Sequence, residues 1–308
     1  MDTTKSILQE IEYALPSGEH IQFSMKRDDL IDNLISGNKW RKLNYNIEQA
    51  RHLKKSGVLT FGGAYSNHLV ATAKAGSLFG LKTIGIVRGE ELTPTSNDTL
   101  KQCAEFGMEL LFVPRSEYQE RGSYEYQSCL KDQFQDYLII PEGGANFHGV
   151  VGCQEIMLET ANDFDHIVVA SGTGTTAAGI LLSIPDQSNL HVYSALKGEF
   201  LLKDITGLLK GILYNDEVVD TYINQLTFSS DSLFGGYGKW NQELIDFIQD
   251  FYHQTGVKLD PIYTGKAVYK MIHCSRIFAH QSKVLFIHTG GIQGVKGVEQ
   301  KLGYQLFI

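Results

Sequence analysis

The amino-acid sequence predicts an α/β protein whose open, twisted sheets are mostly parallel. Short apolar runs bounded by turn residues alternate with longer segments of helical period, which is the pattern of parallel strands joined by crossover helices. Most of these runs are too continuously apolar to leave one face of a strand in water. The expected strands cover residues 58–61, 83–87, 110–113, 137–140, 166–170, 191–194 and 284–288.

Helices are expected to cover the sheets. Residues 69–79 and 96–106 have helical period, and residues 242–252 place their apolar side chains on one stripe. A further helix is expected to follow Lys39 and to end near Leu53. In open α/β sheets, ligands bind beyond the carboxyl ends of the strands, where glycine lets backbone amides approach closely. Glycine-rich turns stand at residues 62–63, 143–144, 172–174, 235–236 and 290–291.

Composition excludes several classes of protein. The 308 residues are 43% hydrophobic and 20% charged, so the chain can bury a large core. A formal charge of −8 gives no attraction to phosphate backbones, and no nucleic-acid partner is expected. The N-terminal segment lacks the apolar centre of a secretion signal, and no apolar run approaches the roughly 20 residues that span a bilayer. We therefore expect a cytoplasmic protein with no membrane partner.

Cysteine spacing and linker composition are uninformative about sites or boundaries. The four cysteines are far apart and form no Cys-x-x-Cys pair, so the sequence predicts neither a metal site nor a disulfide framework. No internal repeat, low-complexity tract or linker appears. Any domain boundary therefore depends on topology.

The first candidate for chemistry is the segment Ser-Gly-Asn-Lys-Trp-Arg-Lys-Leu at residues 36–43. Lys39 follows a Gly-Asn turn and precedes a helical segment, so its side chain has limited freedom. Partial desolvation, or neighbouring cations such as Arg41 and Lys42, would lower its pKa and make the amine available to form an imine. The alternative is a solvated basic helix start, because charge runs usually face water.

The second candidate is the loop Ser-Gly-Thr-Gly-Thr-Thr-Ala-Ala-Gly at residues 171–179, between an apolar strand and a helical run at residues 179–184. Backbone N–H groups, three threonine hydroxyls and the positive end of a helix suit a terminal phosphate. The alternative is a turn that binds nothing. Residues 172–177 also satisfy G-x-G-x-x-A, which makes an NAD(P) oxidoreductase a second hypothesis. A dinucleotide site requires an acidic residue after the next strand to bind the ribose, but residues 195–197 are Ala-Leu-Lys.

The third candidate is Phe-Gly-Gly-Ala-Tyr-Ser-Asn-His at residues 61–68, again at a strand end and a helix start. Ser66 or Asn67 alone can serve as a helix N-cap. The glycine pair, Tyr65 and His68 favour contact with a ligand, because a cap needs none of them.

With Tyr-Thr-Gly-Lys at residues 263–266 and His-Thr-Gly-Gly at residues 288–291, these segments resemble the D-cysteine desulfhydrase and 1-aminocyclopropane-1-carboxylate (ACC) deaminase family. Its members use pyridoxal 5′-phosphate (PLP) and have the tryptophan synthase β-like fold, fold type II. The motifs follow the family order from Lys-Arg-Asp-Asp at residues 26–29 onwards. The resemblance implies two domains: a small α/β domain at residues 43–148, and a large PLP-binding domain at residues 1–42 plus 149–308.

The resemblance implies a role for each matching residue. Lys39 matches the lysine that holds PLP as an imine, and Asn67 matches the residue that hydrogen-bonds the ring hydroxyl. Ser66 and His68 match residues that face the substrate carboxylate and the reacting atoms. Thr289 matches the hydroxyl partner of the pyridine nitrogen. The phosphate loop and the two active-site tyrosines are matched by Thr173, Gly174, Thr175 and Thr176, and by Tyr237 and Tyr263.

The implied activity is that of a PLP-dependent lyase acting on a small amino acid, in a homodimer. α,β-Elimination of D-cysteine or a similar β-substituted amino acid would give pyruvate, ammonia and sulfide. Lys39 would remove the α-proton, and Tyr237 or Tyr263 would protonate or position the leaving sulfur, while Ser66 contacts the substrate. The alternatives are ACC deaminase, which releases 2-oxobutyrate and ammonia, and a non-catalytic PLP-binding protein.

Position 264 separates the two activities. In the ACC deaminases that this chain resembles, the motif is Tyr-Glu-Gly-Lys, whereas this chain has Tyr-Thr-Gly-Lys. A carboxylate keeps the pyridine nitrogen protonated, whereas a threonine hydroxyl offers only a neutral hydrogen bond. Thr264 and Thr289 therefore favour the desulfhydrase branch. Tyr65 stands where the family commonly has glutamine, so a different β-substituted substrate is also open.

Overall fold

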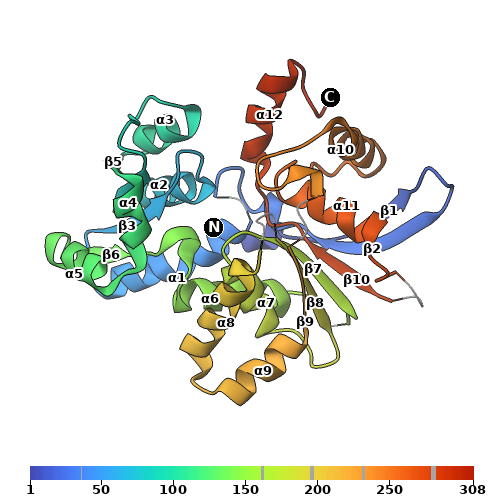
Figure 1. Ribbon diagram of the computed structural model, residues 1–308, viewed down its shortest axis with the longest axis horizontal. Coiled ribbons are helices and arrows are strands. Elements are labelled where there is room, and N and C mark those ends of the chain that lie inside the picture. The colour runs from blue at the N-terminus through green and yellow to red at the C-terminus, as the bar shows by residue number, and fades with distance from the viewer. Residues whose placement is uncertain (36, 161–162, 195–197, 231–232, 279–281) are drawn as a thin grey trace. The chain divides into compact units, whose positions relative to one another are not determined.

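The computed structural model describes residues 1–35, 37–160, 163–194, 198–230, 233–278 and 282–308. The chain packs into two compact units (Figure 1). The first unit combines Met1–Asn38 with Cys153–Ile308, and the second is Lys39–Gly152. The domain boundaries expected after residues 42 and 148 stay a prediction.

The first unit is built on a six-stranded sheet with the order β1-β2-β10-β7-β8-β9. β1 and β2 form an antiparallel hairpin, and the other neighbouring strands are parallel. The predicted α/β architecture with mostly parallel sheets is confirmed. The strands are β1 (Leu8–Ala14), β2 (His20–Lys26), β7 (His166–Ser171), β8 (Asn189–Ser194), β9 (Leu226–Ser229) and β10 (Val284–Ile287).

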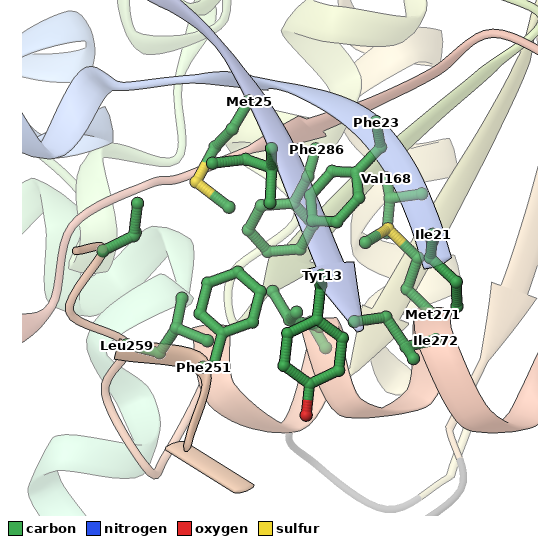
Figure 2. Close-up of a cluster of buried hydrophobic side chains, with 14 of the residues drawn as sticks. Tyr13, Ile21, Phe23, Met25, Val168, Phe251, Leu259, Met271, Ile272 and Phe286 are labelled. Carbon is green, nitrogen blue, oxygen red and sulfur yellow. The ribbon is translucent and has the colours of Figure 1, made fainter. Parts of the chain in front are cut away.

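One face of this sheet is buried under α10 (Gln242–Thr255) and α11 (Thr264–Cys274), as Figure 1 shows. Val168 and Phe286 point from the central strands into the same apolar cluster as Met25, Phe251 and Met271 (Figure 2). The predicted stripe on residues 242–252 is confirmed, because its apolar side chains are buried. Burial of such side chains contributes about 25 cal/mol to stability for each Å² of apolar surface removed from water. The central strands therefore place apolar side chains on this face.

The opposite face of the first sheet lies against helices α7, α8 and α9 (Figure 1). α7 contacts β7 and β8, and α8 packs on both α7 and α9. Among the helices that the structure describes, none combines the length and apolar content needed to cross a membrane. The helices on this face are α7 (Thr175–Leu181), α8 (Phe200–Leu213) and α9 (Asp216–Asn224), and the C-terminal helix is α12 (Val295–Leu302).

The second unit contains a parallel four-stranded sheet with the order β5-β4-β3-β6. Every residue of β3 is buried, because α2 and α3 pack on one face of the sheet and α4 and α5 on the other. Its strands are β3 (Gly57–Gly62), β4 (Lys82–Arg88), β5 (Met108–Val113) and β6 (Tyr137–Ile139). Its helices are α1 (Asn38–His52), α2 (Asn67–Phe79), α3 (Asp98–Glu105), α4 (Arg115–Gln119), α5 (Tyr124–Gln133) and α6 (Phe147–Leu158), of which α1 begins and α6 ends in the first unit.

Two features differ from the sequence prediction. β1, β2 and β9 were not predicted, and β1 alternates between exposed and buried residues instead of forming a continuous apolar run. α7 begins at Thr175, four residues before the predicted helical run at residues 179–184. The helix starts early because Gly174 adopts a left-handed conformation (φ 75°) that turns the chain directly into the first turn.

Candidate active site

The predicted phosphate loop follows β7, at the carboxyl edge of the first sheet. Gly174 must be glycine, since its φ is positive and a Cβ there would lie 3.0 Å from Ile205 Cγ1 on α8. Thr175 and Thr176 form the first turn of α7, where no side chain caps the backbone N–H groups. Within the described part of the chain, the buried hydroxyl of Thr175 has no hydrogen-bond partner. A buried hydroxyl without a partner costs about 1 to 3 kcal/mol, which an anionic oxygen at this place would recover.

Asn38 connects this loop to the predicted cofactor lysine. Its Nδ2 donates to Thr176 Oγ1 at 3.0 Å, and its backbone N–H donates to the carbonyl of Thr289 at 3.3 Å. Gly37 has φ 56°, and a Cβ there would overlap the same Thr289 carbonyl. Lys39 is the next residue along the chain. The backbone that leads into Lys39 is therefore fixed against two segments that lie far away in the sequence.

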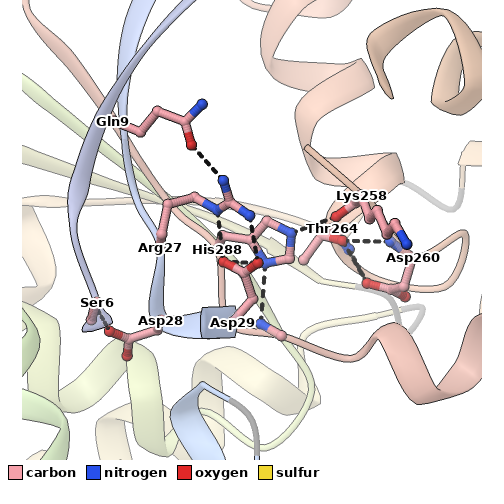
Figure 3. Close-up of polar contacts among 10 residues, drawn as sticks. Ser6, Gln9, Arg27, Asp28, Asp29, Lys258, Asp260, Thr264 and His288 are labelled. Carbon is pink, nitrogen blue, oxygen red and sulfur yellow. Dashed lines mark hydrogen bonds and ion pairs between the residues drawn. The ribbon is translucent and has the colours of Figure 1, made fainter. Parts of the chain in front are cut away.

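The Thr289 turn is held by a buried polar network at the end of β10 (Figure 3). His288 Nδ1 accepts the N–H of Gly290 at 3.2 Å, which leaves Nε2 to donate to the carbonyl of Lys258 at 2.8 Å. Asp29 forms a two-point ion pair with Arg27, at 2.9 and 2.8 Å, and lies 3.6 Å from His288 Nδ1. Thr289 thus follows a histidine whose ring is fixed on both nitrogens.

The two predicted active-site tyrosines lie together in the first unit. The rings of Tyr237 and Tyr263 meet edge to face with centroids 5.9 Å apart. Tyr263 also lies close to the phosphate loop, because a Cβ on Gly172 would be 3.4 Å from its ring. The first unit therefore brings together the loop, both tyrosines and, through Asn38, the Thr289 turn.

Asp260 sets the position of Tyr263. Its buried carboxylate accepts the backbone N–H groups of Ile262, Tyr263 and Thr264 at 2.7 to 2.9 Å, and the Thr264 hydroxyl at 2.6 Å (Figure 3). An acidic side chain at the N-terminus of α11 also interacts favourably with the helix dipole. Position 264 is the one that favours the desulfhydrase branch. The hydroxyl of Thr264 therefore takes part in the hydrogen bonds that cap α11.

Lys39 lies in the first turn of α1, where the alternative of a solvated basic helix start is wrong. Arg41 and Lys42 are buried and Lys39 is half-buried. Trp40 fixes this turn by stacking on Phe79, with ring centroids 5.6 Å apart. A cation held in such a place has lost part of its hydration, which is the condition expected of an imine-forming lysine.

Ser66, Asn67 and His68 begin α2 in the second unit. Ser66 is the N-cap, and its hydroxyl accepts the N–H of Leu69 at 3.3 Å. Asn67, the first residue of the helix, is partly exposed. The capping role considered for Ser66 is confirmed, and the roles of Ser66 and Asn67 toward a ligand stay predictions.

His68 is held in one tautomer by a buried hydrogen-bond chain. The hydroxyl of Thr60 donates to the carbonyl of Ile140 at 2.8 Å, so its oxygen accepts a hydrogen bond from the N–H at His68 Nε2 at 3.0 Å. Nδ1 then carries a lone pair, and it has no partner within the described residues. Burial lowers the pKa of His68 to about 3, and the charges of Lys39 and Lys42 add to this effect. His68 is therefore a neutral acceptor at physiological pH.

The fold and these residues are those of a class of α/β proteins in which the first unit has a loop suited to a terminal phosphate and the second unit has a partly desolvated lysine. Residues 13–195 match the family model described as "Pyridoxal-phosphate dependent enzyme". The chain belongs to this family, in the branch of D-cysteine desulfhydrase and ACC deaminase relatives.

Individual relatives cover most of the chain. A Pyrococcus horikoshii protein, named provisionally as an ACC deaminase, is 33% identical over 90% of this chain and 87% of its own length. The Arabidopsis thaliana protein named "Bifunctional D-cysteine desulfhydrase/1-aminocyclopropane-1-carboxylate deaminase, mitochondrial" is 30% identical over 91% of this chain and 74% of its own length. The crystal structure of an ACC deaminase homologue superposes with a TM-score of 0.74, at 28% identity, over 97% of this chain and 94% of that one.

The residues present fit PLP, the cofactor of this family. The unpartnered hydroxyl of Thr175 and the uncapped first turn of α7 supply donors for a phosphate, and Lys39 follows the residue bonded to Thr176. Within the described residues, no group of three His, Cys, Asp or Glu side chains is placed to hold a metal ion. The alternative of an NAD(P) oxidoreductase is wrong at the level of the family, because the matched residues 13–195 include residues 172–177 and belong to a pyridoxal-phosphate enzyme family.

Sequence reasoning missed several residues of the site. Asn38, Thr60 and Asp260 each hold a predicted residue in place through hydrogen bonds. Only Asp260 left a local signal, since an acidic residue just before a helix is a common cap. Asn38 and Thr60 act on partners 138 and 8 residues away, and neither pairing is visible as a motif.

Proposed function

We propose that this chain catalyses PLP-dependent α,β-elimination of a small β-substituted amino acid, with D-cysteine as the expected substrate. The products would be pyruvate, ammonia and sulfide. The observation that supports this branch is that position 264 holds a threonine whose hydroxyl is bonded to Asp260, instead of a carboxylate. The name of the Arabidopsis relative includes D-cysteine desulfhydrase activity.

PLP, when bound, withdraws electrons from the α-carbon of the attached amino acid. Thr173, Gly174, Thr175 and Thr176 would bind its phosphate, and Lys39 Nζ would hold its aldehyde carbon. Lys39 Nζ, when free, would accept the α-proton of the substrate. The half-buried position of Lys39 in the first turn of α1, where Trp40 stacks on Phe79, supports this role.

The remaining residues would bind the substrate and the ring. Ser66 and Asn67 begin α2, whose N-terminal dipole favours a carboxylate or a phenolate oxygen. His68 Nδ1 offers only an acceptor, so it suits an ammonium or hydroxyl donor. A phenol of Tyr237 or Tyr263 would give its proton to the departing sulfur. Thr289 would contact the pyridine nitrogen with a neutral hydroxyl.

Covalent trapping tests the role of Lys39. Borohydride reduction of the PLP-loaded protein, followed by peptide mass spectrometry, is expected to place the cofactor on Lys39. The Lys39→Ala protein is expected to lose both the label and the visible absorbance of bound PLP. A label on Lys42 in the wild type would overturn the assignment.

A substrate panel tests the reaction. D-Cysteine, L-cysteine, β-chloroalanine and ACC are each incubated with the holoenzyme, and keto acids are separated by chromatography. Pyruvate from D-cysteine supports the elimination, whereas 2-oxobutyrate from ACC supports the alternative deaminase that the relatives' names suggest. PLP binding with no keto acid from any of the four would support the non-catalytic alternative.

The homodimer and the cytoplasmic location also stay proposals. The family resemblance supports a dimer, and light scattering after size-exclusion chromatography measures it directly. A mass of one chain would contradict the dimer. Fractionation of the source cells tests the location, which matters because the Arabidopsis relative is named as mitochondrial.

A further inference from the structure

The segment that carries Tyr237 has little intrinsic rigidity. Gly235, Gly236 and Gly238 surround the tyrosine, and all three have positive φ values of 91°, 96° and 69°. Glycine loses more conformational entropy on folding than any other residue, so a run of this kind needs contacts that hold it. Tyr237 itself is 52% exposed and supplies little of that restraint by burial.

Lys266 supplies a contact at the centre of this segment. From the first turn of α11, its Nζ donates to the carbonyl of Gly236 at 2.6 Å. Two backbone hydrogen bonds within the segment are longer, at 3.3 Å from Gly236 N to Leu233 O and 3.2 Å from Lys239 N to Gly236 O. A hydrogen bond from a charged donor is shorter and roughly twice as strong as a neutral one. Lys266 is therefore a stronger polar restraint on Gly236, the residue that precedes Tyr237, than either of these backbone hydrogen bonds.

The surroundings of Lys266 leave little water to compete for its hydrogen bond. Lys266 is only 8% exposed; burial lowers its pKa, and the charge of Asp260 opposes this shift and favours the ammonium form. Lys266 also lines a pocket together with Gly236 and Tyr263. The same helix turn thus presents the ring that Tyr237 contacts and the cation that holds its neighbour.

We propose that Lys266 is a positioning residue, which fixes the Gly236 carbonyl and thereby keeps the phenol of Tyr237 beside Tyr263. This inference rests on the proposed function in one respect, the use of Tyr237 on the substrate. Lys266 itself has no contact with reacting atoms in this scheme. Its action is on the geometry of residues 233–239.

Hydrogen–deuterium exchange of the holoenzyme tests the proposal. In Lys266→Met, which keeps the length of the side chain but removes the donor, the peptide covering residues 233–239 is expected to exchange about ten-fold faster, equivalent to about 1.4 kcal/mol. PLP absorbance is expected to stay unchanged, and kcat for elimination to fall with little change in KM. Lys301→Met, on the exposed face of α12, is the matched control and should leave exchange and kcat as in the wild type.

Two results would overturn the proposal. Unchanged exchange in Lys266→Met would show that Lys266 does not hold the segment, whatever the activity. Faster exchange with an unchanged kcat would show that the segment's position is irrelevant to the reaction. Tyr237→Phe separates this from the proposed function: if that variant eliminates D-cysteine normally, the role of Tyr237 fails, while the exchange measurement still decides what Lys266 does.

Discussion

His68 makes the pH dependence of stability a direct test of the hydrogen-bond chain in the second unit. A second proton on the ring would place a charge at Nδ1, which is buried with no partner in the described part of the chain. Burial, with Lys39 and Lys42, lowers the pKa of His68 to about 3 in the folded protein. The unfolded chain returns the group to its ordinary value of 6.5.

These two pKa values set the sign and size of the effect. Below pH 6.5 the histidine is protonated in the unfolded chain but not in the folded protein. The free energy of unfolding therefore falls as the pH decreases toward the folded pKa of about 3. Between pH 7 and pH 5, linkage gives a loss of about 2 kcal/mol from this histidine alone. His68→Gln removes the titration, so the variant is expected to lose about 2 kcal/mol less than the wild type over the same interval.

Urea unfolding at the two pH values measures the difference. His52→Gln, at an exposed position of α1, is the matched control and should follow the wild-type pH dependence. Nitrogen-15 NMR of the histidine rings checks the state directly, with His68 expected as the neutral tautomer protonated at Nε2 throughout this range. Equal pH dependence in wild type and His68→Gln, or a His68 signal that titrates near its ordinary pKa, would refute the reasoning.

Three further substitutions test the first unit. Thr175→Val removes a hydroxyl that has no partner among the described residues, so apoprotein stability should not fall, while PLP affinity, measured by absorbance titration, should drop about ten-fold; equal affinity would remove Thr175 from the phosphate site. Gly37→Ala places a Cβ against the Thr289 carbonyl at positive φ and should cost about 2 kcal/mol in urea unfolding and weaken PLP binding; a wild-type PLP titration would contradict this. Asp260→Ala should lower the free energy of unfolding by about 2 to 4 kcal/mol in the same assay, because three N–H groups lose their acceptor. Asp260→Asn should recover part of this stability. A loss below 1 kcal/mol in Asp260→Ala would show that the cap contributes little.

The sequence predicted the elements whose burial is two-sided. β3 and β4 read as apolar runs because helices cover both faces of their sheet. β1 was missed because only its Ile11 and Tyr13 are buried, so it gives alternation over a short stretch and not a run. Its identity as a strand depends on pairing with β2, which is a tertiary fact.

The sequence also indicated candidate site motifs, but not how each of their residues is held. Burial of Arg41 and Lys42 could not be predicted, since the same letters describe a solvated helix start. The protonation state of His68 depends on Thr60, whose hydroxyl orientation is set in turn by the carbonyl of Ile140, 80 residues later in the chain. Such chains of hydrogen bonds exist only after the strand ends have been brought together.

The placement of Lys39 shows how this dependence reaches the chemistry. Gly37 can approach the Thr289 carbonyl only because it has no Cβ, and this approach lets Asn38 donate to both Thr289 and Thr176. The backbone position of Lys39 is therefore set by the contacts of Gly37 and Asn38, and not by contacts of the lysine side chain itself. A lysine has about 2 kcal/mol of rotamer entropy to lose, and a fixed backbone leaves only that part to be ordered if Lys39 binds the cofactor as proposed.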